Sequence, residues 1–151
     1  MSTTYPLHPA TAANPATESH VVRTTHTTLR YLFAAVPIVA GLDKFTNLLA
    51  QWEVYLNPLA LSILPVTAPT FMHIVGVIEI VVGILVFVKP RLGGFVVMGW
   101  LFAIALQLIF WGRFLDVAVR DIVIALSGPL ILARLTPIVE RVSAVRKRER
   151  I

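Results

Sequence analysis

Long apolar runs alternate with short polar connections along most of this chain. Four stretches carry enough apolar residues to cross the roughly 30 Å of bilayer hydrocarbon as helices of about 20 residues: about 29–50, 71–88, 92–111 and 115–135. The connections around Pro90 and at Gly112 and Arg113 are only a few residues long, so consecutive helices must run antiparallel. The pattern therefore predicts an all-α protein, with an antiparallel four-helix transmembrane bundle over residues 29–135.

The flanking segments lack this apolar pattern. Residues 1–28 are rich in Ser, Thr, Pro, Ala and His and are predicted to form a disordered tail. Because the first apolar run begins only near Leu29 without a preceding basic region, it is predicted to be an uncleaved span rather than a secretory signal. Residues 136–151 are predicted to form a basic C-terminal tail. The segment 51–68, with Trp52 and Tyr55 and several prolines, is predicted to be an interfacial loop or short helix.

Composition and charge fit a lipid environment. The chain is 57% hydrophobic and 14% charged, with a mean hydropathy of +0.81, and a soluble domain of this length could not bury that much apolar surface. The formal net charge of +5 comes from residues at the predicted membrane edges, which favours lipid headgroups over nucleic acid as the partner. Ten Lys and Arg residues lie in the two tails and the second connection, against none in the segment 51–68. The positive-inside rule therefore predicts that both termini are cytoplasmic.

Several polar side chains fall inside the predicted spans, where a charge costs several kcal/mol unless it is paired or hydrated. At 1.5 Å per residue, Lys44, Glu79, Gln107 and Arg120 are predicted to lie about 6–12 Å below one surface, in the outer half of the membrane. Such residues are candidates for a ligand site, and the set is Asp43, Lys44, His73, Glu79, Gln107, Arg120 and Asp121.

Two interpretations of these charges stay open. They form buried ion pairs that fix helix register, such as Lys44 with Glu79 and Arg120 with Asp43 or Asp121. Alternatively they form a polar site, in which Glu79 relays protons or hydrogen-bonds a quinone carbonyl. No cluster has the spacing of metal ligands, so no metal site is predicted. The chain has no cysteine, which excludes thiol redox chemistry by this chain alone.

Five motifs carry a resemblance to a known family: Arg30 to Phe33 opening the first span, Gly41 to Phe45 closing it, Gly76 to Glu79 with Gly83 in the second, Lys89 to Gly94 before the third, and Arg120 with Asp121 in the fourth. In their order and spacing over residues 29–135, these motifs resemble the DoxX-like family of small four-helix membrane proteins.

The resemblance implies a function as well as a fold. Some members of the family are the membrane subunit of thiosulfate:quinone oxidoreductase, and others associate with redox enzymes. By that likeness we expect a multi-pass protein of a bacterial inner membrane that serves a quinone-linked redox system as subunit or partner. It would have a polar site in the outer leaflet, no catalytic activity alone, quinone as its cofactor, and a redox enzyme or a second copy as its partner. The alternative is a non-catalytic scaffold or transporter-like protein whose buried charges only hold the bundle together.

Overall fold

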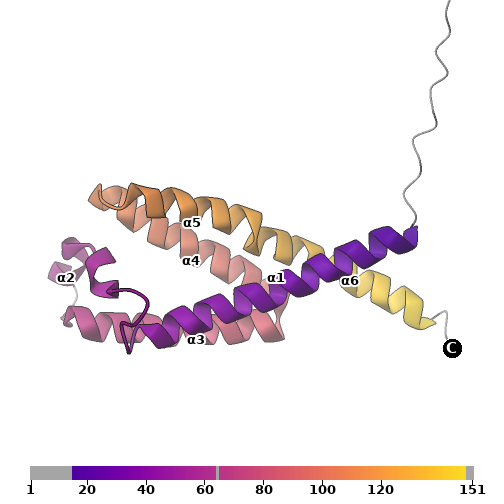
Figure 1. Cartoon of the computed structure of the whole chain (residues 1–151), viewed down its shortest axis with the longest axis horizontal. Coiled ribbons are helices and arrows are strands. Elements are labelled where there is room, and N and C mark those ends of the chain that lie inside the picture. The colour runs from indigo at the N-terminus through magenta and orange to yellow at the C-terminus, as the bar shows by residue number, and fades with distance from the viewer. Residues whose placement is uncertain (1–14, 64, 149–151) are drawn as a thin grey trace, which may run out of the picture.

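The computed structural model describes residues 15–63 and 65–148. This part of the chain is helical and contains no strand (Figure 1), so the predicted all-α class is confirmed. Its elements are α1 (Pro15–Asp43), the 3-10 helix η1 (Trp52–Tyr55), α2 (Pro58–Ile63), α3 (Ala68–Val88), α4 (Pro90–Trp111), α5 (Leu115–Ser127) and α6 (Pro129–Arg148). Residues 1–14 and 149–151 of the two predicted tails lie outside the described residues.

The ends of α3 and α4 follow from local chemistry. The Thr67 side chain caps α3 by accepting the backbone N–H of Thr70 at 3.4 Å, as hydroxyls at helix starts commonly do. Pro90 opens α4, where the amide it lacks would have had no partner in the helix. Gly112 ends α4 with φ of 72°, a left-handed conformation that glycine adopts without strain. These signals place both helices close to their predicted bounds.

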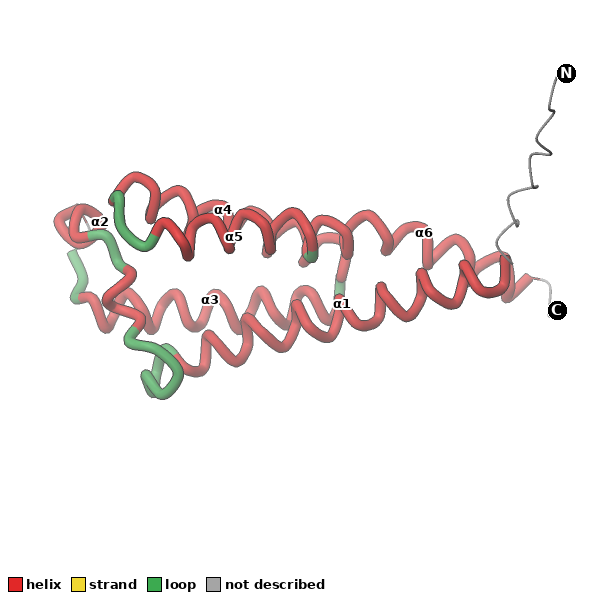
Figure 2. Tube along the Cα trace, turned by 45° about the horizontal axis from the view of Figure 1, so that its top comes forward, coloured by secondary structure: helices red, strands yellow, loops and turns green. Residues whose placement is uncertain are grey.

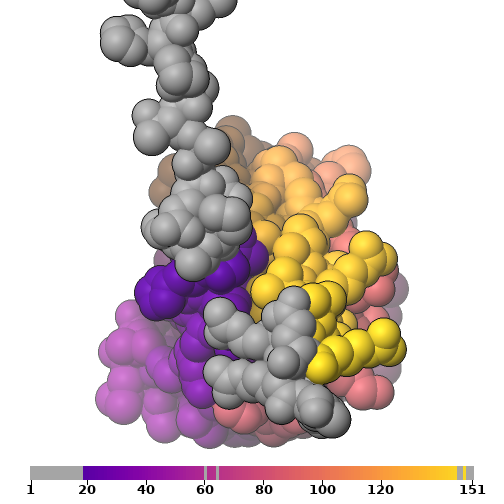
Figure 3. Space-filling model, turned by 90° about the vertical axis from the view of Figure 1, so that its right-hand side faces the viewer, coloured from indigo at the N-terminus to yellow at the C-terminus, as the bar shows by residue number. Residues whose placement is uncertain are grey.

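The long helices pack lengthwise in pairs. α1 lies along α3, and α4 lies along α5 and α6, while contacts of α3 with α4 and of α1 with α6 join the two pairs (Figure 2). The first half of α1 contacts α6 at one end of the molecule (Figure 3). At the other end lie α2 and the connection from α4 to α5 (Figure 1). The main core cluster is formed by Phe33, Ala34, Val82, Val86, Val97 and Leu132.

Among the residues that the structure describes, three helical segments are long and apolar enough to cross a membrane: Ala68–Val88, Pro90–Trp111 and Leu115–Val145, the last containing α5 and most of α6. Many large apolar side chains on the long helices point outward, among them Val81, Phe110 and Val123. A water-soluble protein does not expose apolar area on this scale. The surface is therefore compatible with contact to lipid.

The predicted limits of the first span and of the N-terminal tail were wrong. α1 begins at Pro15 and ends at Asp43, whereas a tail up to residue 28 and a span over 29–50 were predicted. The polar first half of α1 contacts α6 at His26, which is 7% exposed and whose Nε2 lies 3.1 Å from Thr136 Oγ1. Such long-range packing is invisible in the local composition.

The fourth span also differs from its prediction as one helix that ends at residue 135. It is interrupted at Gly128, against which the ring of Phe33 packs closely, and Pro129 starts a new helix that continues to Arg148. Residues 136–148, predicted to belong to a tail, are therefore helical. Proline at a first helical position favours this restart.

Candidate functional site

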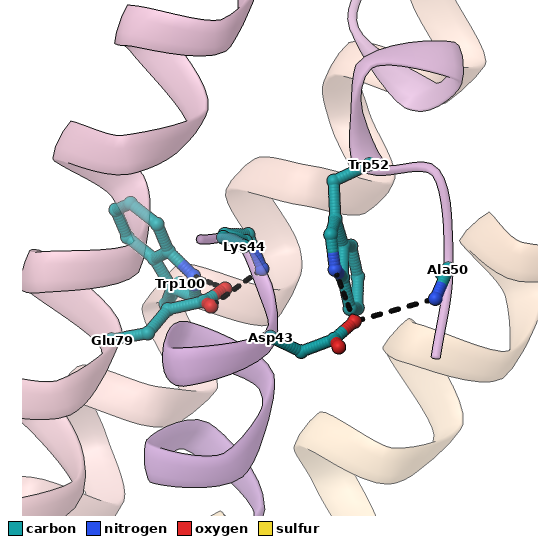
Figure 4. A network of polar contacts seen from close by, with 6 residues as sticks. All are labelled: Asp43, Lys44, Ala50, Trp52, Glu79 and Trp100. Atoms are coloured by element: carbon teal, nitrogen blue, oxygen red, sulfur yellow. Dashed lines mark hydrogen bonds and ion pairs between the residues drawn. The ribbon is translucent and has the colours of Figure 1, made fainter. Parts of the chain in front are cut away.

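The carboxylate of Asp43, the last residue of α1, binds the chain that follows it. It accepts the backbone N–H groups of Leu48 at 2.9 Å, Leu49 at 3.0 Å and Ala50 at 3.3 Å. It also accepts the indole N–H of Trp52 at 2.8 Å (Figure 4). Its side chain thus satisfies three successive amides and one indole.

These bonds explain how α1 can end partway along α3. Amides that leave a helix in an apolar environment must find acceptors, because an unsatisfied backbone group costs several kcal/mol there. One carboxylate has about four acceptor positions, and Asp43 uses them on the loop amides and on the indole N–H of Trp52. Asp43 is therefore the residue that permits the non-helical segment after α1.

The neighbouring Lys44 connects this loop to α3 and α4. Its Nζ lies 2.6 Å from Glu79 Oε2 and 3.7 Å from the ring centre of Trp52. The other carboxylate oxygen of Glu79 accepts the indole N–H of Trp100 at 3.3 Å. Asp43, Lys44 and Glu79 are only 5%, 4% and 7% exposed. We call these five residues, Asp43, Lys44, Trp52, Glu79 and Trp100, the polar clasp (Figure 4).

Two glycines bring α1 and α3 close enough for the clasp to form. A Cβ atom at Gly41 would lie 2.5 Å from the carbonyl oxygen of Gly76, and one at Gly76 would lie 2.6 Å from that of Gly41. The two backbones therefore touch one turn away from the ion pair. Small residues that allow such close approach are typical of helix contacts within membranes.

The remaining candidate residues lie outside the clasp. The Gln107 side chain donates to the carbonyl oxygen of Tyr55 at 2.9 Å and so joins α4 to η1. His73 stacks on Phe45 with ring centres 4.9 Å apart. Arg120 is exposed and Asp121 is buried, both on α5.

Of the ion pairs predicted from the sequence, the one between Lys44 and Glu79 is confirmed and the others were wrong. It is the only ion pair among the side chains that the structure describes. Arg120 pairs with neither Asp43 nor Asp121, because the loop amides occupy Asp43 and because successive residues on α5 point in different directions.

The sequence predicted that the polar groups form one layer, but in the structure they lie at two levels. α3 begins at Ala68, so Glu79 lies about 16 Å along it at 1.5 Å per residue, near the middle of the helix. Trp100 lies equally far from the end of α4 at Trp111. Gln107 and Asp121 lie only about 6–9 Å from the same end. The clasp is therefore central, and the other candidates form a second level nearer the end that carries α2.

The clasp is chemically self-contained. In the described part of the chain, no buried side-chain nitrogen or oxygen lacks a hydrogen-bond partner. No group of three His, Asp or Glu side chains there comes together in a way that could hold a metal ion. The donors on Glu79 are an ammonium and an indole N–H, and the same groups could hydrogen-bond a carbonyl oxygen if the carboxylate moved aside.

Trp52 and Trp100 are the clasp residues that the predicted site lacked. Trp100 carried a signal, since it lies in the middle of an apolar span, whereas tryptophan usually lies at membrane interfaces. A buried indole N–H requires an acceptor, and Glu79 was the acidic residue of the preceding span. Trp52 carried no comparable signal, because interfacial tryptophans are common.

The chain was compared with known proteins in three ways, and no family model, no curated protein and no solved structure matches it.

Proposed function

We propose that the chain is a multi-pass protein of a bacterial inner membrane, in which α1, α3, α4 and the α5–α6 segment cross the bilayer with both termini in the cytoplasm. Support comes from the three apolar segments and from the basic residues near the α3–α4 connection and in α6. The α3–α4 connection lies beside α6, and the start of α1 and the end of α6 extend beyond it in the direction away from α2 (Figure 2), so these basic segments can share one cytoplasmic side, as the positive-inside rule requires.

Single-cysteine labelling tests this topology directly, because the natural chain has no cysteine. Ser62→Cys in α2 and Ser143→Cys in α6 place a thiol at exposed positions near opposite ends. In intact spheroplasts, a membrane-impermeant maleimide should label the first variant and leave the second unlabelled. Inverted vesicles should give the reverse pattern. Labelling of both variants in intact spheroplasts would rule out the proposed topology.

We infer that the protein is a non-catalytic membrane component, a subunit or scaffold, whose buried charges hold its helices together. The observation that carries this inference is that the charged groups of the clasp are all hydrogen-bonded to other groups of the same chain. Each ionised group of Asp43, Lys44 and Glu79 binds other groups of the chain. A complete internal network leaves no polar atom in need of a substrate, and such networks commonly specify packing.

Replacement of the ion pair by apolar residues tests this role. Lys44→Met and Glu79→Leu together remove both charges, and the double variant should fold and complement a strain that lacks the protein. Either substitution alone leaves one buried charge unpaired and should reduce the folded yield. A double variant that folds at wild-type yield but fails to complement would show that the charges have a chemical role.

The second candidate is the quinone-linked redox role that the family resemblance implies. It is favoured by the arrangement of Lys44 between the ring of Trp52 and the carboxylate of Glu79, with Trp100 on the other oxygen (Figure 4). An ammonium, an indole donor and two aromatic rings are groups that bind a quinone head. A redox enzyme would then be the partner that supplies or takes the electrons.

Titration with ubiquinone and menaquinone analogues tests the quinone role in purified protein. Binding should quench tryptophan fluorescence, and Glu79→Gln should shift the quench midpoint several-fold. Asp116→Asn, an exposed position on α5, is the matched control and should leave the midpoint unchanged. A flat titration with both quinones would remove this candidate and leave the non-catalytic role.

A further inference from the structure

A cavity of about 360 Å³ lies between the α3–α4 connection and α6, away from the polar clasp. Lys89 and Arg91 provide two cations on its wall, and Glu140 of α6 provides one carboxylate. Val88, Leu92 and Phe95 provide apolar surface beside these charges. The cavity therefore combines both signs of charge with an apolar wall.

These charges are available to a ligand. The side chains of Lys89, Arg91 and Glu140 are all described, and Glu140 forms an ion pair with neither cation. All three side chains are exposed. Thr136 forms the inner wall, and its hydroxyl already donates to the carbonyl oxygen of Leu132 at 2.8 Å. The first turn of α4 adds the positive end of a helix dipole near the two cations.

The position of the cavity indicates where a ligand would come from. The apolar run of α3 ends at Val88 and is followed at once by Lys89, Pro90 and Arg91. If the chain spans the bilayer as proposed above, this level is the boundary between hydrocarbon and headgroups of the cytoplasmic leaflet. Basic pockets between helices at that boundary bind the phosphates of anionic lipid headgroups, and the same cations can bind the phosphate of other lipids.

We propose that this cavity binds phosphatidylethanolamine of the cytoplasmic leaflet. Lys89 and Arg91 pair with the phosphate, Glu140 accepts hydrogen bonds from the primary ammonium, and an acyl chain lies against Leu92 and Phe95. The carboxylate decides the lipid class. A purely anionic headgroup brings no cation to pair with Glu140, and the choline ammonium has no N–H to donate.

Native mass spectrometry of the purified full chain, with lipids of matched acyl chains, tests this assignment. Phosphatidylethanolamine should bind more tightly than phosphatidylcholine or phosphatidylglycerol. Arg91→Gln should lower the affinity for phosphatidylethanolamine by about fivefold, the effect expected of one interfacial cation. Glu140→Gln should weaken the binding of phosphatidylethanolamine, whereas the binding of phosphatidylglycerol should stay the same or become tighter. The matched controls Arg134→Gln and Glu53→Gln, which lie outside the cavity wall, should change neither.

Several results would overturn the proposal. They are equal binding of phosphatidylethanolamine and phosphatidylcholine, tighter binding of phosphatidylglycerol, or cavity variants that bind like the wild type. Equal binding of free glycerophosphoethanolamine would show that a soluble phosphate compound, rather than a lipid, is the occupant. Failure of the underlying membrane proposal would be seen separately, as release of the protein from membranes by alkaline carbonate.

Discussion

At the scale of single residues, Asp43 binds more backbone groups of the loop than any other side chain described above. Its carboxylate ends α1 and organises the following loop through backbone amides and an indole. A glutamate would place its oxygens one methylene farther away, and an asparagine would replace one acceptor oxygen by a donor. The geometry therefore requires aspartate at this position.

The first prediction follows from that requirement. Asp43→Asn keeps the size of the side chain but leaves one or two loop amides without an acceptor in an apolar environment, which is costly. We expect a lower melting temperature in detergent and a larger loss than for Asp116→Asn, the same chemical change at an exposed position. Equal melting temperatures for the two variants would contradict the capping role.

The ion pair gives a second prediction at the residue scale. Lys44→Met or Glu79→Gln alone leaves one buried group of the pair without its partner and should cost about 3–5 kcal/mol of unfolding free energy. The amide carbonyl that Glu79→Gln introduces can still accept the Trp100 indole N–H. The double variant Lys44→Met with Glu79→Gln therefore leaves no buried charge unpaired, and it should be less destabilised than the sum of the two single variants. Denaturation of the four proteins in mixed micelles measures the coupling energy. Additive losses would show that the two groups do not interact.

At the scale of elements, the contact between α1 and α3 depends on Gly41 and Gly76. Gly76→Ala would place a Cβ atom 2.6 Å from a backbone oxygen of α1, so the helices must separate. We expect a loss of about 1–3 kcal/mol, measured by the same denaturation. Gly99→Ala is the control, because nothing lies within 4 Å of a Cβ at that position of α4, and alanine should leave its helix equally or more stable.

The contact between α1 and α6 is predicted to depend on pH. His26 lies in the polar half of α1, before its apolar part, and burial lowers its pKa below the ordinary value, with the charge of Arg30 lowering it further and that of Glu140 opposing the shift. The folded state therefore favours the neutral imidazole. Its contribution to stability is present above about pH 6.5 and is lost as the pH falls through the lowered pKa of the folded state.

Melting temperatures measured from pH 7.5 down to 5.5 test this pH dependence. The wild type should lose stability toward the acid end, and His26→Gln, which keeps a polar atom near the Thr136 hydroxyl but cannot titrate, should lose less. Parallel curves for the two proteins would show that another group titrates.

At the scale of the whole molecule, the sequence predicted what local chemistry determines. α3 and α4 were predicted closely, because Pro90 and Gly112 mark the ends of their apolar runs. The pair of Lys44 and Glu79 was among the predicted pairs, because opposite charges in apolar helices need each other. The early end of α1 was missed, since it depends on Asp43 binding amides five to seven residues later. Trp100 was missed because a tryptophan carries no charge to mark it inside an apolar span, although its indole N–H needs an acceptor there.

The early end of α1 has a consequence for how the molecule sits in lipid. The loop after Asp43 lies at the level of Glu79, near the middle of α3, and its Leu48 and Leu49 are 84% and 71% exposed. Irregular backbone is tolerated at membrane depth only where its polar groups are satisfied, which the Asp43 carboxylate provides. Leucines facing outward from such a loop fit lipid rather than water.

Leu48→Cys tests whether lipid or water surrounds this loop. In intact membranes the thiol should resist a membrane-impermeant maleimide, because a thiol in hydrocarbon does not ionise and maleimides react with the thiolate. It should react after detergent is added, and Ser62→Cys should react under both conditions. Rapid labelling of Leu48→Cys in intact membranes would mean that water reaches the level of the clasp. The charges there would then line a hydrated site, and the non-catalytic interpretation would give way to the ligand-binding one.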